Sequence, residues 1–588
     1  MKRTILTSVS FAALLAAAPA LAQDNGSTVT QTGAFNKADV QQNGSNGKSK
    51  VDQSGNGVDA ANANEVLVKQ SGNSAESEVY QMVGDRNDVE VIQNGDSYSY
   101  ISQTGKAQEA EVRQAGDGNR SVINQNGNSN TVGNALNSSA AGVIQTGDDN
   151  NSNIDQDLTN FSAANVSQTG DRNNSAIRQE VNAGGGGNES RATVIQLGDD
   201  NNSTINQLST VSQSRLTASV MQTGDDNGAT VNQGGQLNTA NVVQLDNQND
   251  AFVGQTGTNG SVDIKQDEDN SDNSVPRLRG DDGRDASGGD PVRGNYTRVA
   301  QGGDGNDMEI DQKGHLNRAV AGQTGNNADL TIKQRGIFNN ATVAQGSNGT
   351  VGIDQGGAYG DNSAQVTQTA AAGAASATVN QSADTNGPTT FPTNEALVMQ
   401  SAAATTTVDQ TGQQNFADID QSGTGALAEV TQTNTIGGSE AERNRAYVDQ
   451  TAASDAYVSQ IGQANVSRVT QTAASSNQVD MANAYAAYVE QRGYGNNSEI
   501  TQTGADNAAA VSQDGTGLGS IITQGATNST ADVTQTGELN NSYVYQTDGS
   551  GHSAVVSQSG FGNTSTINQS GMNNSATVTQ SGGGSSPN

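Results

Sequence analysis

A glutamine that returns every eleven residues constrains the fold of this chain more than any other feature. The clearest run is Gln491, Gln502, Gln513, Gln524, Gln535 and Gln546. Glycine stands two residues after most of them, asparagine often at five, Ala or Ser at seven, and Val or Ile at nine. Offsets five, seven, nine and eleven differ by two, so in an extended chain these side chains share one face. The unit predicts a strand with one buried face, followed by a tight turn.

An eleven-residue period can also indicate a right-handed helical supercoil, at about 3.67 residues per turn. The residue types exclude this alternative, because Gly, Asn, Thr and Val recur in every unit and are poor helix formers. The apolar positions also alternate instead of recurring at three and four. We therefore interpret the repeat as β-structure.

Two such units make one coil of about 22 residues with two facing sheets, and about 22 coils stacked at about 4.8 Å predict a rod on the order of 105 Å long. The predicted fold is an all-β β-solenoid of stacked strand-turn-strand coils. Glycine after the strand permits the positive φ of a tight turn. Inner Gln and Asn are expected to stack into amide ladders.

The structural repeat positions on which this prediction depends are Gln31, Gly33, Asn36, Ala38, Val40, Gln42, Gln222, Gly224, Asn227, Ala229, Gln233, Gln312, Gly314, Asn317, Ala319, Gln323, Gln502, Gly504, Asn507, Ala509, Val511 and Gln513.

Residues 1–22 have the anatomy of a secretion signal peptide: Lys2 and Arg3, a short apolar run, and Ala20-Leu21-Ala22 as a small-x-small cleavage site. We expect a short mature N-terminus at 23–28, the solenoid at 29–582 and a flexible tail at 583–588. Longer intervals between glutamines predict loop insertions between strands. The largest is 267–298, and others are 126–143, 180–194, 382–397, 433–447 and 472–488.

Composition limits the possible functions. With 71 glycines, no cysteine and 3% aromatic residues, the chain is unlike an ordinary enzyme, and the repeat argues against disorder because coils bury their apolar face on each other. The formal charge of −33 becomes −33 − 2 = −35 once Lys2 and Arg3 leave with the signal. Nucleic acid and anionic membranes are excluded as partners because both need a basic surface. After the signal, no segment is apolar enough to span a membrane.

We predict no catalytic, cofactor or metal site. His315 and His552 are the only histidines, and both are expected in exposed turns. Weak calcium motifs remain as an alternative. Residues 302–307 fit the start of a calcium-binding nonapeptide, 267–278 partly mimic a calcium loop, and acidic turns such as 148–150, 199–201 and 225–227 could collect Ca²⁺. Ordinary turns and solvated acids are the favoured interpretation of all three. An Arg279-Gly280-Asp281 tripeptide lies in the largest insertion.

The segment from Gln31 to Gln42 resembles the repeat of curlin-repeat proteins position by position, as do segments beginning at Gln222, Gln233, Gln312, Gln334, Gln410 and Gln502. The resemblance covers about residues 29–581. It implies a secreted β-solenoid that assembles into amyloid fibres of a biofilm matrix at a bacterial surface. The implied partners are other copies of the chain, further curlin-repeat subunits and an outer-membrane secretion channel.

The expected function is therefore structural and not enzymatic: a subunit of a curli-like functional amyloid, which self-assembles by strand-edge stacking with Gln/Asn ladders. The alternative is a monomeric β-solenoid adhesin that binds a surface through inserted loops such as 267–298. A third reading is a matrix protein that responds to calcium.

Overall fold

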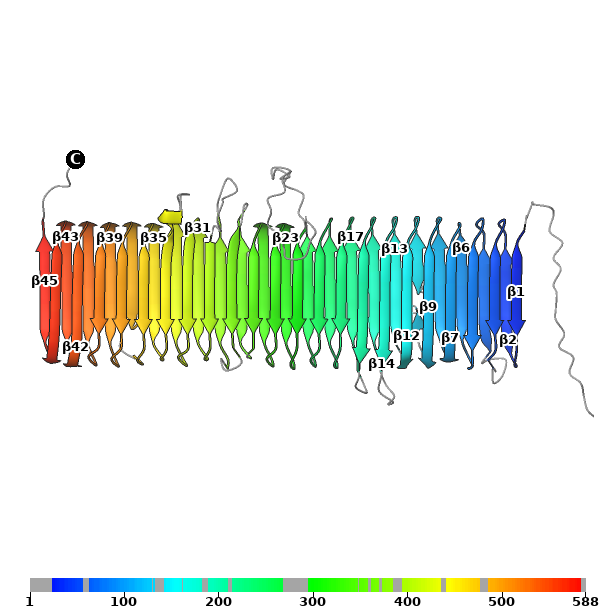
Figure 1. The fold of residues 1–588 in the computed structure, drawn as a ribbon, viewed down its shortest axis with the longest axis horizontal. Helices are drawn as coiled ribbons and strands as arrows, with labels where there is room; N and C mark the ends of the chain where they lie inside the picture. The colour runs from blue at the N-terminus through cyan, green and yellow to red at the C-terminus, as the bar shows by residue number, and fades with distance from the viewer. Residues whose placement is uncertain are drawn as a thin grey trace, which may run out of the picture.

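The structure, a computed structural model, describes residues 24–582 except 56–62, 129–130, 133–141, 161, 182–188, 210–213, 268–293, 347, 358–360, 370–372, 384–393, 435–439 and 476–484. The described residues form an all-β solenoid of 45 strands, numbered β1 to β45, with one short 3-10 turn, η3 (Glu440–Glu442). The fold class predicted from the repeat is confirmed. Figure 1 shows the strands side by side along the long axis, with β1 at one end and β45 at the other.

Two parallel sheets face each other, and each coil contributes a strand to both. Sheet A has 22 strands: β1 (Gly26–Gln31), β3 (Lys48–Gln53), β5 (Glu76–Met82), β7 (Tyr98–Lys106), β9 (Arg120–Asn128), β12 (Asn151–Asn160), β14 (Asn174–Val181), β16 (Asn202–Ser209), β18 (Gly228–Gln233), β20 (Asp250–Gln255), β22 (Tyr296–Gln301), β24 (Arg318–Gln323), β26 (Asn340–Gln345), β28 (Asn362–Gln368), β30 (Asn394–Gln400), β32 (Asn415–Gln421), β34 (Asn444–Gln450), β36 (Val466–Gln471), β38 (Asn497–Gln502), β40 (Gly519–Gln524), β42 (Asn541–Ser550) and β44 (Thr564–Met572).

Sheet B consists of β2 (Asn36–Gln42), β4 (Asn64–Gln70), β6 (Asp88–Asn94), β8 (Glu109–Ala115), β10 (Thr131–Val132), β11 (Val143–Thr146), β13 (Ala163–Thr169), β15 (Arg191–Leu197), β17 (Thr217–Thr223), β19 (Thr239–Leu245), β21 (Ser261–Asp267), β23 (Asp307–His315), β25 (Asp329–Ile337), β27 (Thr350–Gly356), β29 (Ser376–Ser382), β31 (Thr405–Gly412), β33 (Leu427–Asn434), β35 (Asp455–Gln463), β37 (Ala487–Tyr494), β39 (Ala508–Thr516), β41 (Thr530–Glu538), β43 (Ser553–Phe561) and β45 (Ser575–Ser581). The short strands β10 and β11 share one rung, because both pair with β8 and with β13.

Each strand pairs in parallel with the equivalent strand of the next coil, so repeat positions stack on themselves. In sheet A, for example, Ile500 pairs with Ile522 and Gln502 with Gln524. Alternate residues point inward, and the inward Ala, Val and Ile residues form one continuous core from Val51 to Ile567. This core is thin, because small side chains let the two sheets approach closely. Each coil shields the apolar side chains of its neighbours from water, so a thick core is not needed.

The solenoid continues across its longest insertion. β21 ends at Asp267 and β22 begins at Tyr296, yet β20 pairs with β22 and β21 pairs with β23 in unbroken register. The insertion therefore falls between two strands whose pairing it leaves intact, and extra length at a turn costs little.

Two separate structural requirements explain why glycine occurs two residues after the repeat glutamine. Gly33, Gly224 and Gly314 have positive φ values of 110°, 103° and 95°, as the repeat predicts. Gly504 is different, because it is not among the residues with positive φ; a Cβ there would lie 1.9 Å from the carbonyl oxygen of Ala526. Close approach of the next coil is therefore a second reason for glycine at this position.

Gly537→Ala should lower the free energy of unfolding of its coil by about 1–3 kcal/mol, because it combines both costs. Gly537 has a φ of 100°, and its Cβ would lie 2.2 Å from the carbonyl oxygen of Gly560. The matched control is Gly352→Ala on β27, where a Cβ would meet nothing within 4 Å. Thermal unfolding of both variants measures the difference; equal stability would contradict the turn geometry.

Candidate functional site

Two uninterrupted glutamine ladders run through the described length of the solenoid. The sheet A ladder begins at Gln31 and ends at Gln569, and the sheet B ladder begins at Gln42 and ends at Gln580. In every rung the Nε2 of one glutamine donates to the Oε1 of the glutamine in the next coil, at 2.7–3.0 Å. The ladders also cross the 268–293 insertion, through Gln255 to Gln301 and Gln266 to Gln312.

In most ladder glutamines, the second N–H connects the two sheets. Gln513 on sheet B donates to the carbonyl oxygen of Asn497 on sheet A at 3.1 Å, and Gln502 donates to Ala486 at 3.1 Å. An inner glutamine thus satisfies a ladder partner and a backbone carbonyl together. This explains how the core can hold a buried amide in nearly every internal strand.

Asparagines at the start of the strands form further ladders. Asn317 donates to Asn295 Oδ1 at 3.0 Å and accepts at its own Oδ1 from Asn339. It also donates to the carbonyl oxygen of Lys313 in its own turn at 3.1 Å and to that of Gly336 in the turn of the next coil at 3.0 Å. The residue just before such an asparagine has positive φ at Phe35, Asp226 and Leu316. We did not predict this second left-handed position. Asp or Asn four residues after the repeat glutamine would have indicated a positive φ at this position, but Phe35 and Leu316 give no such indication.

The structure places the predicted repeat positions of internal coils in the core. Those with at most 4% exposure are Gln222, Asn227, Ala229, Gln233, Gln312, Asn317, Ala319, Gln323, Gln502, Asn507, Ala509, Val511 and Gln513. In the first coil Gln31 is exposed, and Asn36, Ala38, Val40 and Gln42 are half-buried, because no coil precedes this one among the described residues.

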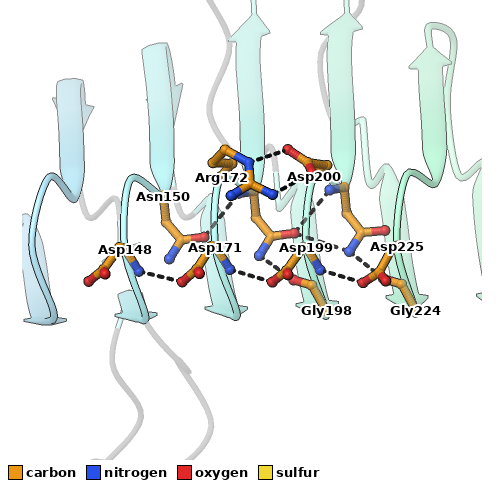
Figure 2. A network of polar contacts seen from close by, with 11 residues as sticks. Asp148, Asn150, Asp171, Arg172, Gly198, Asp199, Asp200, Gly224 and Asp225 are labelled. Carbon is orange, nitrogen blue, oxygen red and sulfur yellow. Dashed lines mark hydrogen bonds and ion pairs between the residues drawn. The ribbon is translucent and has the colours of Figure 1, made fainter.

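Acidic residues at successive turns also form a ladder (Figure 2). The backbone N–H of Asp148 donates to Asp171 Oδ1 at 2.8 Å, that of Asp171 to Asp199 at 2.7 Å, and that of Asp199 to Asp225 at 2.8 Å. Each of these carboxylates therefore accepts a hydrogen bond from a backbone N–H in the turn of the preceding coil. Beside this ladder, the guanidinium group of Arg172 donates two hydrogen bonds to the carboxylate of Asp200, from Nε to Oδ1 at 2.8 Å and from Nη2 to Oδ2 at 2.7 Å. These bonds lower the pKa of Asp200 and raise that of Arg172.

The calcium motifs take ordinary structural roles where the structure describes them. In 302–307, Gly303 and Gly305 have positive φ and the N–H of Asp304 donates to Asn326 Oδ1 at 2.9 Å, as in neighbouring turns. Within the described ranges, no group of three or more His, Cys, Asp or Glu side chains is placed to hold a metal ion. Residues 269–278 and the Arg279-Gly280-Asp281 tripeptide lie outside the described residues.

The expectation of two exposed turn histidines is wrong for His552, which is 1% exposed. Its ring takes the place of a ladder asparagine, and Nε2 lies 2.8 Å from the carbonyl oxygen of Asp548 in the same turn. The turn after Gln546 is one residue longer than its neighbours, which gives room for the larger side chain. His315 ends β23 and is half-buried. The two histidines lie in different turns with no cysteine nearby to form a catalytic pair.

A row of carboxylates lies on the outer face of sheet B, where Glu65, Asp88 and Glu109 pair across β4, β6 and β8. Partial burial raises the pKa of Asp88, and the charges of Glu109, Glu65 and Glu90 raise it further. A raised native pKa stabilises the fold below the unfolded pKa, and this contribution is lost as pH rises through the native pKa.

Asp88→Asn should therefore stabilise the chain at pH 7, by a few tenths of a kcal/mol to about 1 kcal/mol, the range for like charges on paired strands. Solvent screening favours the low end, because Asp88 is exposed. At about pH 3 the variant and the parent should be equally stable, because the carboxyl is protonated in both states. Urea unfolding at both pH values measures this, and a destabilised variant at pH 7 would contradict the account.

The comparisons with known proteins agree with this geometry. The curlin associated repeat family matches residues 303–336, 402–433, 487–515, 526–560 and 553–582. The C-terminal region of the chain therefore carries curlin repeats. No curated protein matches the sequence. The matched segments begin after the longest insertion, although the same pattern of paired strands extends from β1 to β45. Curlin repeats on a parallel solenoid indicate a structural protein of curli type. Within the described residues, no helix is long and apolar enough to cross a membrane.

Proposed function

We propose that this curlin-repeat protein is a secreted subunit of a curli-like amyloid fibre, which assembles by stacking the last coil of one chain on the first coil of the next. The observation that carries the proposal is the pair of ladders that run unbroken from the first described coil to the last. Its further partners are other curlin-repeat chains and an outer-membrane secretion channel. The proposed signal peptide, residues 1–22, lies outside the described residues.

The ladders give the stack a direction. Because every Nε2 donates toward the C-terminal end, Gln31 and Gln42 present Oε1 acceptors at the first coil. At the last coil, Gln569 and Gln580 present amide groups that have no following rung among the described residues. An acceptor end fits a donor end, so head-to-tail stacking extends both ladders, whereas two like ends do not match.

The two end coils also share one register. Gln31 and Gln42 are eleven residues apart, as are Gln569 and Gln580. In that register Val29 stacks on Ile567 and Val40 stacks on Val578, so every inner apolar position meets another. The chain carries −33 overall, yet no charged side chain follows Asp548. The C-terminal end can therefore approach another copy without the repulsion that the rest of the surface imposes.

The backbone at the C-terminal edge supplies the other hydrogen bonds. Outward-facing residues direct their N–H to the following coil, as when Thr503 donates to the carbonyl oxygen of Gln524 at 2.9 Å. By the same register, the N–H groups of Thr566 and Thr577 point off the last coil. An open parallel edge of this kind pairs readily with another chain.

Proline at both Thr566 and Thr577 should leave the solenoid folded and slow fibre elongation. Each proline removes one N–H from an edge, where proline is tolerated. Losing two hydrogen bonds of about 1 kcal/mol each predicts a decrease of about 10- to 30-fold. Thioflavin fluorescence of reactions seeded with parent fibres measures the rate, and valine at both positions is the control. Unchanged elongation by the proline variant would refute stacking at this end.

Deletion of residues 270–293 distinguishes the fibre function from the adhesin function, because it shortens the interval from Gln266 to Gln301 from 35 residues to the usual eleven (35 − 24 = 11). The strands on either side keep their partners without the insertion, so fibres should form as in the parent. If the deletion abolishes adhesion while fibres still form, the result would support the alternative function, a surface adhesin that binds through this insertion.

A further inference from the structure

One stretch of the outer surface of sheet B lacks acidic side chains. It comprises the outward residues of β11, β13, β15, β17 and β19, which we call the neutral face. Its strands pair so that Ile195, Met221 and Val243 form one row along the solenoid. These three are half-buried by their neighbours, and Leu197 beside them is 41% exposed.

The neutral face is bounded by charge on both sides. Glu109 and Glu111 point outward on β8, and Asp263 and Asp267 do so on β21. Arg191 is the one charged outward residue on the five strands. The neutral face thus combines an apolar row with no acidic side chain, on a chain of charge −33.

We propose that the neutral face binds the same face of a second copy of this chain, so that two solenoids lie side by side. Like charge opposes contact between copies over most of the surface, but not here. Sheets of this kind pack face to face at about 10 Å, with rows of side chains between them. A second copy supplies a flat neutral sheet with the same strand spacing, so the two apolar rows can meet along their whole length.

The acidic turns determine the direction of the pair. Asp148, Asp171, Asp199 and Asp225 follow β11, β13, β15 and β17, so they line one edge of the neutral face. If the two-fold axis runs along the strands, the two solenoids point in opposite directions and their acidic edges lie together. If the axis runs along the solenoid, the two solenoids point in the same direction and their acidic edges lie on opposite sides of the pair. Charge therefore favours the second arrangement.

Arg191 fits this arrangement. It lies four residues before Ile195, and Asp199 lies four residues after it, so each is about 13 Å from the row along the strand. Rotation about an axis on the row brings Arg191 of one copy over the acidic turn of the other. The single cation of the face then meets the carboxylates at its partner's edge.

The contact is small. Five strands at about 4.8 Å and a strand length of about 20 Å give on the order of 500 Å² per copy, below the roughly 800 Å² of a stable complex. We therefore expect weak pairing of free chains. Chains already aligned in a fibre present one such face per subunit, so many weak contacts act together.

Cysteine cross-linking tests the proposal, because the chain contains no cysteine. Met221→Cys places one thiol on the row, next to its own copy across the two-fold axis. Under mild oxidation we expect a disulfide-linked dimer whose yield is at least about fivefold above that of Ile92→Cys, an outward control on β6 of the same sheet, where Asp88 and Glu90 also point outward. Equal or no cross-linking at Met221 would overturn the proposal.

The direction has its own test. In the proposed pair, residue 193 of one copy lies opposite residue 197 of the other. A mixture of Thr193→Cys and Leu197→Cys chains should therefore cross-link more than either variant alone, and preferential linking of each variant to itself would refute the parallel arrangement. Both assays use unassembled chain, so they remain informative if end stacking fails. Arg191→Glu should reduce the dimer yield, whereas Arg191→Lys should largely retain it.

Discussion

Val511→Asp should destabilise the coils around β39 by several kcal/mol, because it buries a carboxylate between two sheets. Val511 is 0% exposed and lies between Val489 and Val533 on the neighbouring strands. Val511 lies in a cluster of apolar side chains, and an unpaired charge in an apolar layer has a high desolvation cost. Since each coil contacts only its neighbours, the loss should stay local, with β37 to β41 opening before the rest.

Hydrogen exchange followed by mass spectrometry measures this directly. Peptides from residues 487–538 should lose protection in Val511→Asp, while peptides from β3 to β9 should not change. The matched control is Ser512→Asp, one residue along the same strand, whose side chain points outward. Equal protection in Val511→Asp and Ser512→Asp would show that the inside and outside faces are assigned wrongly.

Gln513→Ala should have the next largest effect, because it removes one rung of a ladder that is otherwise complete. Gln491 donates to Gln513 at 2.9 Å, and Gln513 donates to Gln535 at 2.9 Å. The substitution leaves a buried donor and a buried acceptor unpaired, at about 1–3 kcal/mol each. It also removes the bond to the carbonyl oxygen of Asn497, which joins the two sheets.

An outward glutamine provides the control for this prediction. Gln365 lies on β28 with its side chain exposed, so Gln365→Ala should change stability by less than about 0.5 kcal/mol. Thermal unfolding compares the two variants. If Gln513→Ala is as stable as Gln365→Ala, the ladders do not contribute to stability as described.

The sequence predicts the cross-section of the solenoid because each coil repeats one simple alternation. Ala509, Val511 and Gln513 differ by two, which already defines the inner face, and the recurring glutamines imply that they stack. The all-β class and the 22-residue coil follow from this spacing. The continuity of the stack does not follow, because spacing cannot show whether strands separated by an insertion pair again.

The details of the turns were harder to predict. Gly504 and Gly537 occupy the same position in the repeat, but only Gly537 has positive φ. His552 was expected at the surface because it lies in a turn, and only the path of the longer turn shows that its ring replaces a ladder amide. The neutral face was also missed, because it depends on which outward residues become neighbours across five strands.

Electron microscopy of the purified chain after incubation at neutral pH tests the central claim most directly. One solenoid of 22 rungs at about 4.8 Å is a rod on the order of 105 Å long. If chains stack end to end, the images should show filaments many times longer than this, with the width of one solenoid or of a side-by-side pair. A population of single rods of about 105 Å that never lengthens would contradict the account.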